Sequence, residues 1–272
     1  MTTPKNIKLF TFPPVPHVYS TSAFGMKLES YFRVNQIDYQ PIYTSKFSST
    51  GTIPYIKLGD QDDHEVSDTN VIIDYFRNEV KGFQDTDWKL LSAQERATTH
   101  AVVRMLEEHT SQIGFHYRYS KKIMPKFLSS VNVPENVFNS DNSCSGSMTV
   151  KLWKCFQPGI TKKKSEARGL SRHSDQDLYK FSNADLSCLE DILAATKDTG
   201  GSFFFGKEQA TLIDCAVFGH VSQFVWIPID FPQKDHIVEN CPNLYNFLFN
   251  FRAKYWPDWE EKCQRKQNVE HK

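Results

Sequence analysis

The sequence lacks an excess of one charge, long apolar runs and closely spaced cysteines. Basic and acidic side chains balance at 32 each, so no overall field favours nucleic acid or an anionic membrane as a partner. No apolar run approaches the length that spans a bilayer, and the first residues lack the apolar core of a signal peptide. We therefore expect a soluble cytoplasmic protein with no transmembrane segment and no nucleic-acid partner.

The six cysteines form no C-x-x-C pair, and the nine histidines form no H-x-x-x-H pair. We expect no dedicated metal site, because such sites draw on these spacings. The cysteine usage favours a reducing compartment. Cys188 and Cys215 fall within helical patterns, where we interpret them as small apolar residues.

Aromatic residues are plentiful, at 14% of 272 residues. This composition argues against disorder and supplies a core for one large domain or two small ones. No internal repeat is present, so the chain is not a repeat array.

The first third of the chain alternates between strand and helix patterns. A proline opens the strand "TIPYIKL", and a Gly59-Asp60 hairpin signal follows it. The expected elements are a strand at Ile7–Phe12, a helix at Ala23–Val34, strands at Tyr39–Tyr43, Thr52–Leu58 and His64–Val66, and a helix from Thr69 with Val71, Ile72, Tyr75 and Phe76 on one face. This order is that of a thioredoxin-like unit.

Beyond this unit the strand signals nearly vanish. Two capping boxes, "SAQE" at 92–95 and "TLID" at 211–214, predict helix starts, because each pairs a hydroxyl with an acid three residues later. The first opens a helix with Val102, Met105, Leu106, His109 and Ile113 on its apolar face, and the second precedes a buried helix at Cys215–Val225. We predict a first domain at 1–81, a linker at 82–86, a helical domain at 87–262 and a polar tail at 263–272.

Two stretches of the helical domain stand apart in composition. Ser, Asn and Gly concentrate at 139–147, which predicts a loop. Basic residues concentrate at 151–172, around Lys162-Lys163-Lys164. This segment is either a solvated helix face or a patch for an acidic partner or lipid headgroups.

Three motifs resemble the glutathione-transferase fold, in which an N-terminal thioredoxin-like domain precedes a C-terminal all-helical domain. They are "TIPYI", "DTNVIIDYF" at 68–76 and "FFFGKEQATLIDCAVFGHV" at 203–221. "GLSRHS" at 169–174 and "YWPDW" at 255–259 resemble the failed-axon-connections family, which is allied to metaxins and to the cadmium-responsive transferase-like proteins. The resemblance implies an α/β plus all-α protein of the glutathione S-transferase-like superfamily.

The resemblance also implies a glutathione site at the edge of the first domain. Pro54 stands where the family has a cis proline, and the backbone of Ile53 would pair with the cysteinyl part of glutathione like an added strand. Asp68 would take the α-amino group and Thr69 the carboxylate, beside the free amides of a helix start. Thr69 is alternatively a plain helix cap, and the two roles are compatible.

Ser22, in the stretch "STSAFGMKLE", stands where related transferases place a serine or a cysteine. A serine hydroxyl there would donate a hydrogen bond to the glutathione thiolate and lower the pKa of the thiol. Alternatively Ser22 only caps the following helix, in a protein that has lost catalysis. Ser20 and Thr21 are near enough to be the donor instead. Gly25 occupies the second redox position, so dithiol exchange is not expected.

His109 lies on the helix that lines the electrophile pocket in transferases, as a core histidine or a substrate-pocket residue.

Two functions remain open. The chain either binds glutathione as a co-substrate and conjugates or reduces small electrophiles, in detoxification or a stress response, with Ser22 catalytic. Or it is a non-catalytic adaptor of the failed-axon-connections or metaxin type that acts through a protein partner. A homodimer is also left open.

Overall fold

A four-stranded sheet with two helices forms the first part of the structure, a computed structural model that describes residues 6–59, 64–131, 159–196 and 200–264. The strands are β1 (Lys8–Thr11), β2 (Gln40–Tyr43), β3 (Tyr55–Leu58) and β4 (His64–Ser67), in the order β2-β1-β3-β4. β1 and β2 are parallel, so a crossover helix, α1 (Ala23–Val34), joins them. The other pairs are antiparallel, and α2 (Thr69–Asn78) follows β4. The predicted thioredoxin-like unit is confirmed.

The second part of the chain is helical in the residues that the structure describes. Its helices are α3 (Thr86–Leu90), α4 (Ala93–Met105), the π-helix η1 (Leu106–Thr110), α5 (Ser111–Arg118), α6 (Met124–Val131), a helix at 159–167, the 3-10 turn η3 (Leu170–Arg172), α8 (Asp175–Ala195), the 3-10 turn η5 (Phe204–Gly206), α9 (Leu212–Trp226), α10 (Pro232–Asn240), α11 (Pro242–Tyr255) and α12 (Trp259–Gln264). Both predicted capping boxes are present, at Ser92 and at Thr211. No helix within the described ranges is long and apolar enough to cross a membrane.

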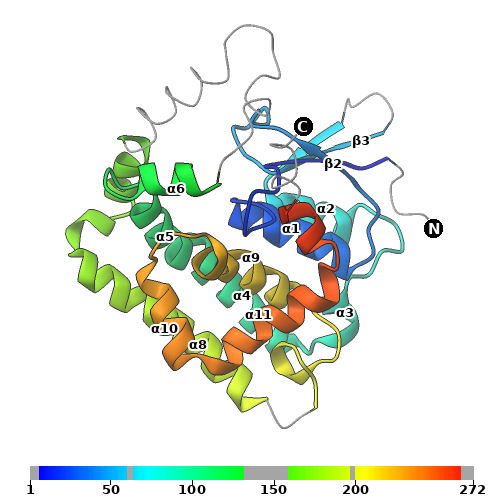
Figure 1. The fold of residues 1–272 in the computed structure, drawn as a ribbon. Coiled ribbons are helices and arrows are strands. Elements are labelled where there is room, and N and C mark those ends of the chain that lie inside the picture. The colour runs from blue at the N-terminus through cyan, green and yellow to red at the C-terminus, as the bar shows by residue number, and fades with distance from the viewer. Residues whose placement is uncertain (1–5, 60–63, 132–158, 197–199, 265–272) are drawn as a thin grey trace, which may run out of the picture.

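The two parts meet mainly where α1 packs along α9 (Figure 1). Both helices are buried on nearly all sides. Their backbones approach closely at Gly219, where a Cβ atom would lie 2.6 Å from the amide nitrogen of Lys27 and 2.8 Å from the carbonyl oxygen of Ala23. Any side chain at this position would push the helices apart. The buried helix predicted at 215–225 is therefore confirmed, and it forms the central contact between the two parts.

The C-terminal motif "YWPDW" folds back onto α1 of the first part. Arg33 of α1 donates to both carboxylate oxygens of Asp258, at 2.6 and 3.0 Å. The Arg33 guanidinium also lies 4.0 Å from the centre of the Trp256 ring. A planar fork and stacking on an aromatic ring are specific to arginine. The motif thus ties the end of the described chain to α1.

Two expectations about core residues are wrong. Val71, predicted on the buried face of its helix, is 54% exposed, because α2 turns Ile72, Ile73 and Phe76 toward the sheet and α1 instead. Cys188 lies in a helix as predicted, but its side chain is exposed. In both cases the residue lies in a helix, as the apolar period predicts. The period alone does not specify which face of the helix meets the core.

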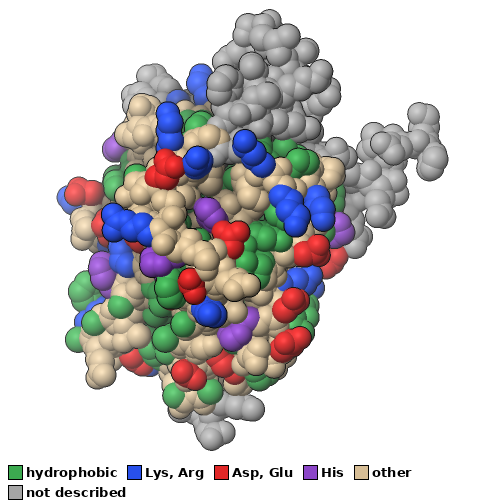
Figure 2. Space-filling view, turned by 90° about the vertical axis from the view of Figure 1, so that its left-hand side faces the viewer, with side chains coloured by type: hydrophobic (Ala, Val, Ile, Leu, Met, Phe, Trp, Pro, Cys, Tyr) green, Lys and Arg blue, Asp and Glu red, His purple; other side chains and the backbone are tan. Residues whose placement is uncertain are grey.

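The predicted loop at 139–147 and the first part of the basic segment lie outside the described residues. Within the described part, the three lysines at 162–164 are exposed on the helix at 159–167. Lys162 pairs with Glu166 at 3.8 Å along the same helix. On the face of the molecule shown in Figure 2, basic and acidic side chains are interspersed. Exposure of these lysines is expected for either interpretation of the basic segment.

Candidate functional site

Ser22 caps α1. Its Oγ accepts a hydrogen bond from the Gly25 amide at 3.0 Å, and its backbone is extended, as in a helix N-cap. The residue is 9% exposed. Capping uses a lone pair of the oxygen, and the hydroxyl proton has no acceptor among the described residues. The two interpretations of Ser22 are therefore compatible, because one hydroxyl can cap the helix and donate to a ligand.

Two further hydroxyls lie with Ser22 around Gly25. The Oγ of Ser20 accepts from the Ser22 amide at 3.2 Å. The Oγ1 of Thr11, at the end of β1, is buried and has no hydrogen-bond partner in the described residues. A Cβ atom at position 25 would lie 2.8 Å from Thr11 Oγ1 and 3.4 Å from Ser20 Oγ. Glycine is needed here, and a second cysteine for dithiol exchange would not fit without a shift.

Two buried side chains of the helical part hold the loop that precedes Ser22. Arg118, the last residue of α5, donates to the carbonyl oxygen of Thr21 at 3.0 Å, and Gln223 of α9 donates to that of Ser20 at 3.1 Å. These contacts join residues 97 and 203 positions apart. The place of the serine loop therefore depends on both parts of the structure. No pattern in the sequence indicated either side chain.

The Ile53–Pro54 peptide bond is cis, as the resemblance implies. Ile53 is half-buried and Pro54 is buried, directly before β3. The strand predicted from residue 52 therefore begins after the proline, at Tyr55. The cis bond is the part of the predicted binding edge that the structure shows.

Asp68, and not Thr69, is the N-cap of α2. The Oδ1 of Asp68 accepts from the amides of Asn70 and Val71 at 2.8 and 3.4 Å, so the expectation that these amides are free for a ligand is wrong. Asp68 has a φ of 74°, a left-handed backbone that is uncommon outside glycine and concentrates at functional sites. Thr69 is 2% exposed, and its Oγ1 has no hydrogen-bond partner among the described residues.

A buried ion pair connects the starts of α1 and α2 with η1. Lys27 is fully buried, pairs with Glu107 and donates to Asn70 Oδ1 at 3.0 Å. Asn70 in turn donates to the second Glu107 oxygen at 2.9 Å. Burial lowers the pKa of Lys27, and Glu107 opposes that shift. The sequence contained a signal for this pair, because Lys27 stands between Phe24 and Tyr31 on the apolar stripe of its helix. The sequence analysis did not identify it.

A small cavity lies beside the start of α1, between α5 and α9. It measures about 10 Å³, which is room for one water-sized sphere, and Ala23, Ser111, Arg118, His220 and Gln223 are among its lining residues. The Nδ1 of His220 lies 2.5 Å from Ser111 Oγ, and its Nε2 has no partner in the described residues. Burial lowers the pKa of His220 from 6.5 to about 3. His220 is therefore neutral at pH 7.

His109 is not brought together with Ser22. Its Nδ1 lies 2.7 Å from Asp185 Oδ2 on α8, its ring is near Phe181, and its side chain is 40% exposed. It is therefore no core histidine, and it does not line the cavity beside α1. His109 lies within the π-helical turn η1.

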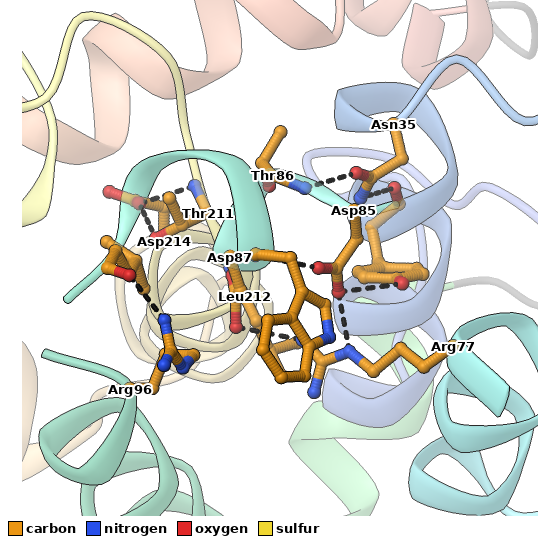
Figure 3. A network of polar contacts seen from close by, with 12 residues as sticks. Asn35, Arg77, Asp85, Thr86, Asp87, Arg96, Thr211, Leu212 and Asp214 are labelled. Carbon is orange, nitrogen blue, oxygen red and sulfur yellow. Dashed lines mark hydrogen bonds and ion pairs between the residues drawn. The ribbon is translucent and has the colours of Figure 1, made fainter. Parts of the chain in front are cut away.

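A second buried polar cluster, the junction network, lies where the first part of the chain passes into α3 (Figure 3). It comprises Arg77, Asp85, Asp87 and Asp214. Asp85 accepts from Arg77 Nε, and Asp87 accepts from Arg77 and from the Leu212 amide, both at 2.8 Å. The predicted linker at 82–86 thus ends in buried carboxylates that bind both parts together.

Asp214 is a fully buried acid of the junction network. Its carboxylate accepts from the amide of Phe204 at 2.9 Å, and from the amide and hydroxyl of Thr211 at 2.8 and 3.0 Å. Burial nevertheless raises its pKa to about 7. The capping box predicted from "TLID" therefore also anchors the segment before α9.

The buried cysteines of the described residues offer no candidate nucleophile. Cys215, Cys241 and Cys263 are buried free thiols, and burial raises the pKa of Cys241 to about 11. A thiol with a raised pKa is a poor nucleophile at neutral pH. In the described part of the chain, no three His, Cys, Asp or Glu side chains are placed to hold a metal ion.

Two family models match the chain. One is described as the glutathione S-transferase N-terminal domain and matches residues 23–124, and the other as the glutathione S-transferase C-terminal domain and matches residues 182–250. Among solved structures, glutathione transferase GSTFuA3 from Phanerochaete chrysosporium aligns with a TM-score of 0.57 at 12% identity, covering 92% of this chain and 97% of that one. Ure2p in complex with glutathione aligns with a TM-score of 0.53 at 11% identity, covering 91% and 95%. At these identities the structures show the fold alone.

Two relatives match nearly the whole chain in sequence. Failed axon connections of Drosophila melanogaster is 27% identical over 265 residues, which are 95% of this chain and 60% of that protein. The chain thus spans about 60% of the length of that relative. Isoprene-epoxide–glutathione S-transferase of Rhodococcus sp. (strain AD45) is 24% identical over 264 residues, which are 92% of this chain and 99% of that enzyme. Fold, matched domains and relatives agree, and the chain belongs to the glutathione S-transferase-like superfamily.

Proposed function

We propose that the chain binds glutathione at the edge of its thioredoxin-like domain and that Ser22 donates a hydrogen bond to the glutathione sulfur. The observation that carries the proposal is the Ser22 hydroxyl, which caps α1 and keeps a proton without an acceptor in the described residues. The start of α1 adds the positive end of a helix dipole. A donor and a helix N-terminus both favour the thiolate over the thiol, and so lower the thiol pKa.

Thr69 supports the binding half of this proposal. Its hydroxyl is buried without a partner, an arrangement that costs free energy unless a ligand supplies an acceptor. The carboxylate of the tripeptide would be that acceptor. Asp68 uses one carboxylate oxygen for the helix cap, and its exposed side chain leaves the other for an ammonium group. Lys27 and Asn70 would hold this helix start in place.

The reaction would be a transfer of the glutathione thiolate to a small electrophile. The thiol proton leaves to solvent, and sulfur forms a bond to an electrophilic carbon. With an epoxide, the class named for the Rhodococcus relative, a carbon–oxygen bond breaks and the oxygen takes a proton from water. A role in detoxification or a stress response, in the cytoplasm, would follow from this activity.

A second candidate is a non-catalytic adaptor that acts through a protein partner, in the manner suggested by the similarity to Failed axon connections. One observation favours it. The first-turn amides of α2, which would bind the γ-glutamyl carboxylate, are occupied by Asp68. A chain that binds no glutathione could satisfy the first-turn amides of α2 with its own Asp68 carboxylate in this way. A metaxin-like role and a homodimer belong to this alternative.

Two substitutions of Ser22 separate capping from chemistry. Ser22→Ala should cost about 1 kcal/mol of unfolding free energy and Ser22→Gly only a few tenths, because glycine is tolerated at an N-cap. Both lack the hydroxyl, so both should slow conjugation by roughly ten- to a thousand-fold. In both, the pKa of bound glutathione, read from thiolate absorbance, should rise.

Calorimetric titration of the wild-type chain with reduced glutathione is the first measurement. Absence of heat, together with an unchanged melting temperature at millimolar glutathione, would refute binding and leave the adaptor. Binding with equal conjugation rates in wild type, Ser22→Ala and Ser22→Gly would restrict Ser22 to capping.

A further inference from the structure

The segment that leads from β1 into the serine loop (residues 20–22) has few hydrogen bonds of its own. Three of its eight residues, 12–19, are prolines, which carry no amide proton. Within the segment the described residues form one backbone–backbone hydrogen bond, from the Val15 amide to the Val18 carbonyl oxygen at 3.1 Å. His17 has a φ of 78°, a left-handed backbone that persists only where the surrounding structure holds it. The place of the segment therefore depends on side chains from other elements.

Tyr19, the last residue of this segment, is held by the C-terminal motif "YWPDW". It is buried, and its ring packs edge-on against the ring of Trp256, with 4.5 Å between the two centres. Its hydroxyl donates to Asp258 Oδ2 at 3.1 Å, a contact between residues 239 positions apart. Burial raises the pKa of Tyr19, so the hydroxyl keeps its proton and remains a donor. Both the ring and the hydroxyl of Tyr19 are thus fixed by the motif.

The same motif also fixes Tyr19 relative to α1. Arg33, in the last turn of that helix, donates to both carboxylate oxygens of Asp258 and to the Tyr19 hydroxyl at 3.2 Å. Ser22 caps the first turn of the same helix. The motif therefore contacts both the end of α1 and the residue that leads into the serine loop at its start. A change at Asp258 would let Tyr19 shift against the helix that Ser22 caps.

The serine loop is held on a second side by α5 and α9. Arg118 donates to the carbonyl oxygen of Thr21, and Gln223 donates to that of Ser20. These bonds fix two backbone groups of the loop, and Tyr19 fixes the backbone that enters it. Neither set of contacts involves the Ser22 hydroxyl itself. The hydroxyl is therefore placed by its neighbours and keeps its proton for another acceptor.

We propose that Asp258 and Trp256 are positioning residues for Ser22, and that through Tyr19 they hold the serine loop in the place from which its hydroxyl reaches the bound sulfur. The identity of the ligand rests on the proposed function, whereas the hold on the loop does not depend on glutathione. A displacement of about 1 Å is enough to cost a reacting group much of its effect, so a looser loop should lower the rate more than the affinity. The proposal gives the "YWPDW" motif a role in the reaction.

Hydrogen exchange in the ligand-free chain tests the hold on the loop. In Asp258→Ala the amides of residues 19–22 should exchange about tenfold faster than in the wild type, because lost buried hydrogen bonds lower the free energy of local opening. Ser182→Ala is the control, because it removes a buried hydrogen bond between α8 and α10, in which Gln233 donates to the Ser182 hydroxyl at 2.9 Å. It should leave exchange at residues 19–22 unchanged. Equal exchange there in the wild type and Asp258→Ala would overturn the proposal.

Tyr19→Phe repeats this test if Asp258→Ala does not fold. It keeps the ring against Trp256 and removes only the hydroxyl that bonds to Asp258 and Arg33. Exchange at residues 19–22 should again be faster than in the wild type. Wild-type exchange in a folded Tyr19→Phe chain would contradict the proposal.

A double-mutant cycle tests whether the motif acts on the reaction through Ser22. Asp258→Ala should slow conjugation per folded molecule by roughly tenfold, and by no more than Ser22→Gly does, with little change in glutathione affinity. In the Ser22→Gly background the hydroxyl is already absent, so Asp258→Ala should slow conjugation no further. Equal slowing in the two backgrounds would overturn the positioning role. Absence of glutathione binding in the wild type would instead refute the proposed function, and the exchange experiment would still decide whether the motif holds the loop.

Discussion

The junction network and the start of α1 are both buried, polar and shared by the two parts of the molecule, yet they differ in how completely their polar atoms are paired. In the junction network each of the three aspartates accepts at least two hydrogen bonds. Around the start of α1, Thr11, Arg118 and His220 each have a buried polar atom without a partner among the described residues.

This difference in pairing distinguishes a cluster that stabilises the fold from a region that is expected to bind a ligand. Buried polar groups in native proteins are nearly always paired, so a cluster whose charged side chains are all paired is explained by its contribution to folding, although the Thr86 hydroxyl beside it has no partner in the described residues. Several unpaired atoms in one place are explained by a ligand that completes them. The starts of α1 and α2 are therefore the part of the molecule where binding is expected, and the junction network is expected to matter for stability alone.

The largest effect should come from breaking the junction network. Asp85→Ala leaves Arg77 and the Tyr31 hydroxyl without this buried carboxylate, and should lower the unfolding free energy by about 3–5 kcal/mol. Unfolding in denaturant measures this loss of unfolding free energy. Glu166→Ala, which removes an exposed ion pair with Lys162, should cost less than about 1 kcal/mol. Similar losses in the two variants would show that the junction network is not the structural cluster inferred here.

An intermediate effect should appear on the acid side of neutrality. His220 has a pKa of about 3 in the folded chain and about 6.5 when unfolded, so below pH 6.5 the unfolded chain binds a proton that the folded chain does not. The unfolding free energy should therefore be complete above pH 6.5 and fall as the pH drops toward 3, by at most about 1.4 kcal/mol per unit.

His220→Gln should remove this contribution. Between pH 7 and pH 5 its unfolding free energy should fall by roughly 2 kcal/mol less than that of the wild type. His100→Gln, at an exposed position of α4, serves as the control and should follow the wild type. Parallel pH profiles for the wild type and His220→Gln would mean that His220 is not held neutral by burial.

The smallest effect on stability is expected at Thr69. Thr69→Val replaces an unpartnered hydroxyl by a methyl group, so the unfolding free energy should stay within about 0.5 kcal/mol. Asp68 supplies the helix cap, so no cap is lost. Glutathione affinity, measured by calorimetry, should nevertheless fall about tenfold.

Thr110→Val is the matched control for Thr69. The Thr110 hydroxyl is buried and donates to Asp185 at 2.6 Å, so this variant should lose about 1–2 kcal/mol without a change in glutathione affinity. If Thr69→Val destabilised the ligand-free chain as much as Thr110→Val, the hydroxyl of Thr69 would have a structural partner, and the contrast between the two regions would fail.

Much of the fold could be predicted because its signals are local. The helix at Ala23–Val34 begins and ends where its apolar period and its serine cap placed it. Both capping boxes formed, since each needs only four consecutive residues. The candidate site was predicted less completely. The helix cap at Ser22 and the cis Ile53–Pro54 bond are as expected. The cap of α2, however, is Asp68, because a left-handed backbone at that residue turns its carboxylate onto the first-turn amides.

The sequence by itself determined which segments are strands and helices, where several helices start, and which superfamily the chain resembles. These properties depend on interactions between residues a few positions apart. Only the tertiary structure decided that Arg118 holds the loop of Ser22, that Lys27 meets Glu107, and that His109 turns toward α8. Such contacts join residues 76 to 97 positions apart. They depend on how whole helices pack and rotate, which no local period specifies.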